Sequence, residues 1–101
     1  MFITAPEQSL AERLVHTVVE ERLAACGTVL GGAVSIYRWE EEVVRAEEVM
    51  VMFKTTRGSV EELKDRIVAL HPYEVPEVLV LDVDGGHLPY LDWVGRESGQ
   101  R

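Results

Sequence analysis

A chain of 101 residues has room for one domain, expected to span residues 1–101, and its 47% apolar content supplies one modest core. Ten basic residues against eighteen acidic ones give a formal net charge of −8, which opposes binding to nucleic acid phosphates and to anionic membranes. One cysteine excludes an internal disulfide, and no apolar run approaches the ~20 residues of a membrane span, so we expect a cytoplasmic protein.

The first elements expected are a short strand and a helix. Residues 2–3 are typical of the end of a strand. Leucines and valines recur at helical spacing over 10–19, which predicts a helix over about residues 6–24. Thr4 and Glu7 have the spacing of a capping box, which predicts that they cap the start of this helix.

A long hairpin follows the first helix. Residues 28–39 are typical of a strand, with alternating polarity over 34–39, and Gly31-Gly32 predicts a bulge or a sharp bend within it. Glu40–Glu42 forms a charged tip, and the return strand reaches Thr55. Strands of about ten residues exceed the usual five or six, and an unpaired long edge favours aggregation. We therefore expect self-assembly by sheet extension, closed into a ring.

The second half of the chain repeats the strand–helix–strand plan. Apolar residues form one stripe over 60–70, Ser59 and Glu62 have capping-box spacing, and a proline stops the helix. A buried strand over 78–81 and a short last helix around 88–94 complete the chain. The order β-α-β-β-α-β-α predicts a ferredoxin-like α+β fold, with helices on one face of an antiparallel four-stranded sheet.

Few side chains point to chemistry. Cys26 is interpreted first as a small buried residue, with a soft metal ligand or redox thiol as the alternative. His71 lies in a loop beside Tyr73 and acidic residues, where it is either a functional group or a helix C-terminal cap. His16 and His87 have no partner at metal-ligand spacing.

The aromatic residues of the hairpin leave two interpretations. Tyr37 and Trp39 flank Arg38, and these residue types are enriched in oligomer interfaces. An oligomer interface is the favoured interpretation, and a site for a planar ligand is the alternative. We find no Gly-rich phosphate loop and no Ser/His/Asp motif, so no enzymatic activity is expected.

Four motifs in order resemble the CutA family, the divalent-cation tolerance proteins. They are Glu20–Cys26, Ser35–Trp39, Leu70–Glu77 and Tyr90–Trp93. The resemblance covers essentially the whole chain and implies a ferredoxin-like protomer in a tight homotrimer similar to the PII signalling proteins. It also implies a cytoplasmic role in divalent-metal tolerance, with copper as the usual ligand.

The resemblance implies two candidate sites. Cys26 and His71 are the implied metal contacts, a pair that suits Cu(I) or Zn(II) by ligand softness. Two ligands are too few for a closed site, so Glu74, a neighbouring protomer or water would add a third. The second candidate site is a cleft between subunits, lined by Tyr37, Trp39, Lys54, His71 and Tyr73. The alternative function is that of a PII-like, non-enzymatic signalling or small-molecule-binding trimer with no direct metal role.

Overall fold

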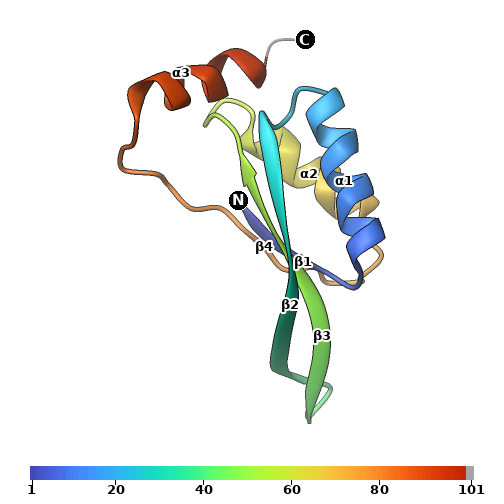
Figure 1. Cartoon of the computed structure of the whole chain (residues 1–101). Coiled ribbons are helices and arrows are strands. Elements are labelled where there is room, and N and C mark those ends of the chain that lie inside the picture. Colours follow the sequence, from blue (N-terminus) through green and yellow to red (C-terminus); the bar gives the residue numbers. More distant parts are fainter. Residues whose placement is uncertain (100–101) are drawn as a thin grey trace.

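The computed structural model describes residues 1–99, and two of its helices cover one face of a four-stranded sheet (Figure 1). The elements are β1 (Phe2–Ala5), α1 (Gln8–Glu20), β2 (Cys26–Trp39), β3 (Glu42–Lys54), α2 (Val60–Leu70), β4 (Val78–Leu79) and α3 (Leu88–Glu97). The strand order is β2-β3-β1-β4, and every neighbouring pair is antiparallel. The predicted ferredoxin-like α+β fold with an extra C-terminal helix is therefore confirmed. The last two residues of the expected domain lie outside the described part.

The core lies between the sheet and the helices α1 and α2. Successive side chains of a strand point to opposite faces, so every second residue of β3 faces the helices. Val49, Val51 and Phe53 are the buried members of that row. The helices contribute the apolar stripe that faces them, which is formed by Ala11, Leu14, Val18, Leu63 and Ile67.

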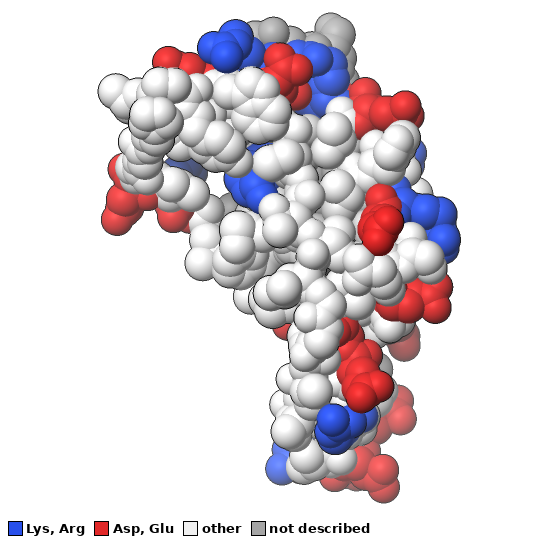
Figure 2. Space-filling model, viewed as in Figure 1, with Lys and Arg blue, Asp and Glu red and all other residues white. Residues whose placement is uncertain are grey.

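The opposite face of the sheet is open. Leu30, Met52 and Leu79, from three strands, remain 65%, 45% and 53% exposed there. Figure 2 shows uncharged surface running from the α3 side down the sheet onto the hairpin, interrupted by a basic group below α3, with other charged groups along the helical side, around α3 and at the hairpin tip. An apolar sheet face that is left open to solvent is typical of a surface that another chain covers.

The hairpin of β2 and β3 projects well beyond the helical layer (Figure 1). The register shifts between Leu30 and Ala33, and Gly32 has a φ of +83°, which confirms the predicted bulge. At the tip, Glu40 and Glu41 have φ values of 49° and 70°. A two-residue turn with both φ values positive usually contains Asn or Gly, so this acidic tip adopts a backbone that its residue types disfavour.

The predicted capping box at the start of the first helix is wrong. Thr4 belongs to β1, where it pairs with Met50, and its backbone is therefore committed to the sheet. Helix α1 begins at Gln8 rather than near residue 6, and Glu7 is its N-cap residue without a side-chain capping bond. It also ends at Glu20, a few residues before the predicted end.

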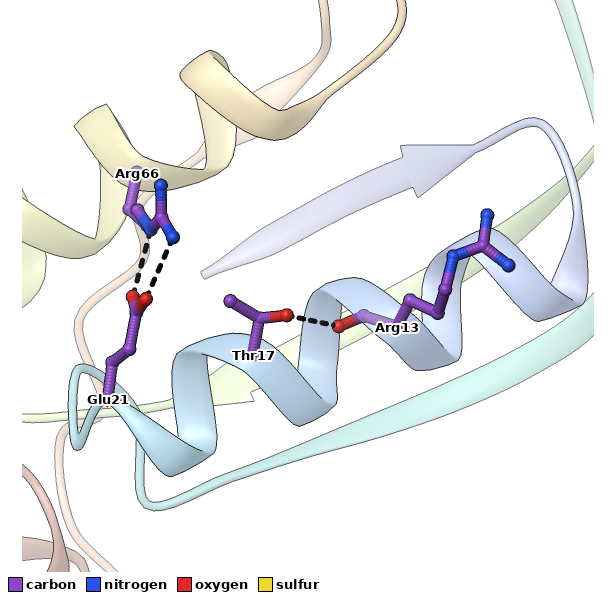
Figure 3. A network of polar contacts seen from close by, with 4 residues as sticks. All are labelled: Arg13, Thr17, Glu21 and Arg66. Atoms are coloured by element: carbon purple, nitrogen blue, oxygen red, sulfur yellow. Dashed lines mark hydrogen bonds and ion pairs between the residues drawn. The ribbon is translucent and has the colours of Figure 1, made fainter.

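Two polar contacts organise the helical layer, and Figure 3 shows them. Arg66 of α2 donates two hydrogen bonds to Glu21, at 2.9 and 2.8 Å, and so joins α2 to the end of α1. Within α1, the Thr17 hydroxyl donates to the backbone carbonyl of Arg13 at 2.9 Å. Because both side chains of the Arg66–Glu21 pair are more than one third exposed, solvent screens the pair and we expect it to add little to the stability of the fold.

Helix α3 is anchored at both ends. Near its start, the Tyr90 hydroxyl lies 3.5 Å from the Cys26 sulfur. Near its end, the Arg22 guanidinium donates to the carbonyl of Arg96 at 2.6 Å, and the N–H of Gly99 donates to the carbonyl of Arg22 at 2.7 Å. Across residues 1–99, none of the helices combines the length and apolar character needed to cross a membrane.

Candidate functional site

A cleft of about 620 Å³ lies between the outer half of the hairpin and the loop after α2. Its lining comes from Ser35–Tyr37 and Trp39 of β2, Glu48 of β3, Thr4 of β1 and residues 73–77 of the loop. The strand register explains this arrangement. The β2 residues 33, 35, 37 and 39 pair with 48, 46, 44 and 42 of β3, so their side chains share one face.

A hydrogen bond between Tyr73 and Glu48 closes the inner end of the cleft. The Tyr73 hydroxyl donates to Oε2 of Glu48 at 2.8 Å, and Glu48 is only 7% exposed. Burial, the hydrogen bond to Glu48, the negative charge of Glu48 and nearby Tyr37 together raise the pKa of Tyr73 to about 12, with burial the largest cause. Tyr73 is therefore a fixed hydrogen-bond donor at neutral pH.

The raised pKa of Tyr73 gives stability a pH dependence. Because the folded-state pKa of about 12 exceeds the ordinary value of 10.0, the contribution is complete below pH 10 and is lost as the pH rises through 12. We expect the urea midpoint to fall between these pH values, and to fall less in Tyr73→Phe. Phenolate absorbance should show a late ionisation that Tyr73→Phe removes, whereas that of Tyr90, whose pKa the contact with Cys26 also raises, should remain. A wild-type midpoint that falls no more than that of the variant would contradict this.

His71 is buried at the base of the same loop. Its Nδ1 accepts a hydrogen bond from the backbone N–H of Tyr73 at 3.1 Å. Nε2 therefore carries the proton, and it donates to the carbonyl oxygen of Thr4 at 2.7 Å. His71 is also the C-cap residue of α2, and its ring lies 4.7 Å from that of Tyr73. Both ring nitrogens are thus engaged in holding the loop against β1.

Cys26 and His71, the two metal contacts implied by the resemblance, lie toward opposite ends of the sheet. Cys26 pairs with Lys54 on β3, whereas Thr4, which contacts His71, pairs with Met50. Four residues of strand between Lys54 and Met50 correspond to roughly 13 Å. One chain therefore does not bring the thiol and the imidazole together.

The third implied metal contact, Glu74, lines the cleft and lies away from Cys26. Within the described residues, no three His, Cys, Asp or Glu side chains are grouped closely enough to hold a metal ion. A site that uses Cys26 needs donors from another copy of the chain. The Cys26 thiol is half-buried, and its recorded contact is the Tyr90 hydroxyl.

The structure brings together three of the residues predicted for the ligand cleft. Tyr37, Trp39 and Tyr73 all line it. Lys54 lies elsewhere in the single chain, where its ammonium donates to the Thr28 hydroxyl at 2.7 Å in a separate hollow beside α3.

Sequence analysis missed Glu48, the carboxylate at the inner end of the cleft. Its signal was the alternation of β3, which puts Glu48 on the same face as Met50 and Met52. A carboxylate in the inner, otherwise apolar half of a strand is seldom buried without a partner. The loop residue Tyr73 is that partner.

The protein is therefore of the ferredoxin-like α+β class, with one open sheet face, a projecting hairpin and a cleft at the hairpin base. The chain belongs to the CutA family, since residues 1–97 match the family model described as CutA1 divalent ion tolerance protein.

Relatives from a bacterium and from human, both named CutA, have similar sequences. The chain is 43% identical to the "Divalent-cation tolerance protein CutA" of Thermus thermophilus over 99 residues, 98% of this chain and 96% of that protein. It is 42% identical to human "Protein CutA" over 93 residues, 92% of this chain, and it spans about half the length (52%) of that protein.

Solved structures show the same fold. The Thermus thermophilus divalent cation tolerance protein superimposes with a TM-score of 0.94 at 44% identity, over 97% of this chain and 95% of that one. A PII-like protein CutA from Nostoc sp., in its apo form, gives 0.90 at 37% identity, over 97% of this chain and 94% of that one.

Proposed function

We propose that this chain acts in divalent-cation tolerance in the cytoplasm, as a non-enzymatic homotrimer that binds copper or another divalent cation. The family and the relatives named divalent-cation tolerance proteins support the cellular role. The open apolar face of the sheet, with Leu30, Met52 and Leu79, is the single observation that carries the assembly.

Both edges of the sheet are free to pair with another copy. Strand β2 is one edge and has 14 residues, which is far more than β4 at the other edge. After β4 the chain continues through Val80, Leu81 and Val83, which are exposed apolar residues. If β2 of one copy pairs with this segment of the next, the interface joins two different surfaces of the chain. Repeating that interface around an axis gives a closed ring. The number of three members in that ring is what the resemblance to the CutA family and the PII signalling proteins implies.

The metal part of the proposal is carried by Cys26. A half-buried thiol at the end of an edge strand is a soft donor that suits Cu(I). His71 and Glu74 complete the proposed set, with donors from a neighbouring copy where one chain keeps them apart. Because both nitrogens of His71 are engaged in hydrogen bonds, loss of Cys26 is expected to weaken copper binding more than loss of His71.

Native mass spectrometry with and without copper, under reducing conditions, tests both parts. We expect a trimer that gains one copper per protomer, and a Cys26→Ser trimer that gains none. His87→Ala is the matched control, since His87 is exposed and outside the proposed set. A trimer that ignores copper would overturn the metal part alone, and a monomer in both conditions would overturn the assembly.

A second candidate function is that of a PII-like trimer that binds a small molecule and has no direct metal role. The cleft favours it, because Tyr37, Trp39 and Tyr73 already meet in one chain whereas the metal set does not. It predicts saturable binding of a small organic ligand to the copper-free trimer.

A further inference from the structure

The turn that ends α1 has a strained backbone at Arg22. The Leu23 N–H donates to the carbonyl of Val18 at 2.9 Å. The Arg22 N–H donates to the carbonyl of Val19 at 3.0 Å, and these two bonds form the Schellman arrangement of a helix end. Arg22 has a φ of +61°, in the left-handed region that glycine usually occupies at this position. A residue with a Cβ is disfavoured there, so the side chain of Arg22 is expected to make contacts that offset the strain.

The Arg22 side chain holds the end of α3. Its Nη2 donates to the carbonyl oxygen of Arg96 at 2.6 Å, and its Nη1 lies 3.8 Å from Oε1 of Glu97. The carbonyl oxygen of Arg22 in turn accepts from the N–H of Gly99 at 2.7 Å. A cation at the C-terminus of a helix satisfies its last carbonyls and complements its dipole. Arg22 therefore binds the last turn of α3 through both its side chain and its backbone.

The segment after α3 fits closely between the other two helices. Gly99 has a φ of +81°, and a Cβ at this residue would lie 2.6 Å from the Oγ of Ser59, at the start of α2. Ser98 and Ser59 are both buried. The C-terminal end of α3 is thus inserted between the end of α1 and the start of α2.

The other end of α3 lies against Cys26. The Tyr90 hydroxyl is 3.5 Å from the Cys26 sulfur, and between the two ends Val94 is the buried residue of this helix. Helix α3 lies across the end of the sheet, with its C-terminal end beside the loop after α1 (Figure 1). A short helix with little buried apolar surface is held weakly and opens as a unit. Release of its C-terminal end therefore also loosens Tyr90 from the thiol.

The grip of Arg22 on α3 carries two internal costs. One is the positive φ of Arg22, and the other is its Nε, which is buried without a hydrogen-bond partner among residues 1–99. A buried N–H that has lost water and gained no acceptor is unfavourable. Strain of this kind is concentrated at sites that switch between conformations. The closed arrangement is therefore less stable than its hydrogen bonds alone would make it.

We propose that α3 is a movable cover over Cys26 and that Arg22 is the latch that holds the cover closed. When the latch opens, the last turn of α3 leaves the end of α1, and Tyr90 moves away from the thiol. The inference rests on the metal part of the proposed function, which it deepens by naming what controls the access of a metal ion to Cys26.

Hydrogen exchange and thiol alkylation of the full chain test the proposal. Arg22→Gln removes the guanidinium, and losing a hydrogen bond from a charged group shifts a local opening by about tenfold. We therefore expect the amides of α3 to exchange about tenfold faster, and Cys26 to react with iodoacetamide faster by about the same factor. Exchange of the core amides over 49–53 in β3 should stay within about twofold, since the sheet does not open with α3.

Arg22→Gly separates the latch from the overall stability of the fold. Glycine removes the side chain and also relieves the positive φ. We expect α3 exchange and Cys26 alkylation to be as fast as in Arg22→Gln, whereas the urea midpoint should be higher than that of Arg22→Gln. Parent-like rates in Arg22→Gly would show that the side chain does not hold the cover.

Arg66→Gln is the matched control, because this neighbouring arginine donates its recorded hydrogen bonds to Glu21 rather than to α3. Both rates should stay within about twofold of the parent. Equal rises in Arg66→Gln and Arg22→Gln would overturn the latch, and so would faster exchange of α3 with unchanged alkylation of Cys26. Copper binding is measured separately, and a trimer that ignores copper overturns the metal part of the proposed function alone.

Discussion

Ile67→Ala is expected to lower the free energy of unfolding by about 2–5 kcal/mol. Ile67 is completely buried (0% exposed) on the stripe of α2 that faces the sheet. Removing most of its side chain loses apolar burial and leaves a cavity, since a packed core relaxes only in part. Urea denaturation followed by circular dichroism, at one fixed protein concentration, measures the change.

Val68→Ala is the matched control for this substitution. Val68 is the next residue of the same helix, also β-branched, and it is 48% exposed. The change removes little buried surface and places a better helix former in α2, so we expect a loss below about 1 kcal/mol. Equal losses at the two positions would show that the stripe does not define the core.

Helix α2 shows what the sequence predicts well. Its apolar stripe and the proline after it are local features, and the structure confirms the predicted helix over Val60–Leu70, with Leu63 and Ile67 fully buried. The long hairpin and its bulge also follow from local features, namely alternating polarity and paired glycines. Elements of this kind need no knowledge of the rest of the fold.

Errors arise where distant strands compete with local motifs. Thr4 has the residue type of a helix cap, but pairing with Met50 in the sheet commits its backbone to β1. Strand β4 was expected over 78–81, but only Val78 and Leu79 pair with β1. Because β1 spans only four residues, it offers a short edge, and the rest of the apolar run continues unpaired.

The candidate site was predicted only in part, for a related reason. Aromatic residues of the hairpin and of the loop were recognised from their types, and three of them meet in the cleft. The burial of Glu48 depends on how the loop folds over β3, which no local pattern encodes. The same folding makes His71 a buried link between Thr4 and Tyr73, whereas its place at the end of α2, one of its two interpretations, follows from the sequence.

His71→Ala is the second large effect expected, with about 2–5 kcal/mol lost from the free energy of unfolding. The substitution leaves the Thr4 carbonyl and the Tyr73 N–H without their partner, and an unpaired buried group costs about 1–3 kcal/mol. The loop that forms one wall of the cleft should loosen as well, so the ionisation of Tyr73 should move toward its ordinary pH. Urea denaturation and phenolate absorbance measure the two effects.

Two near-isosteric variants separate the two hydrogen bonds of His71. Asparagine can keep an acceptor near Nδ1 for the Tyr73 N–H, and glutamine can keep a donor near Nε2 for the Thr4 carbonyl. Each of His71→Asn and His71→Gln should therefore recover about half of the stability that alanine loses. All three are measured with a chelator present, because a histidine that acts only as a metal ligand contributes no stability without metal. If His71→Ala then unfolds at the parent's urea midpoint, its hydrogen bonds are not what holds the loop, and a metal-binding role for its imidazole becomes the better explanation.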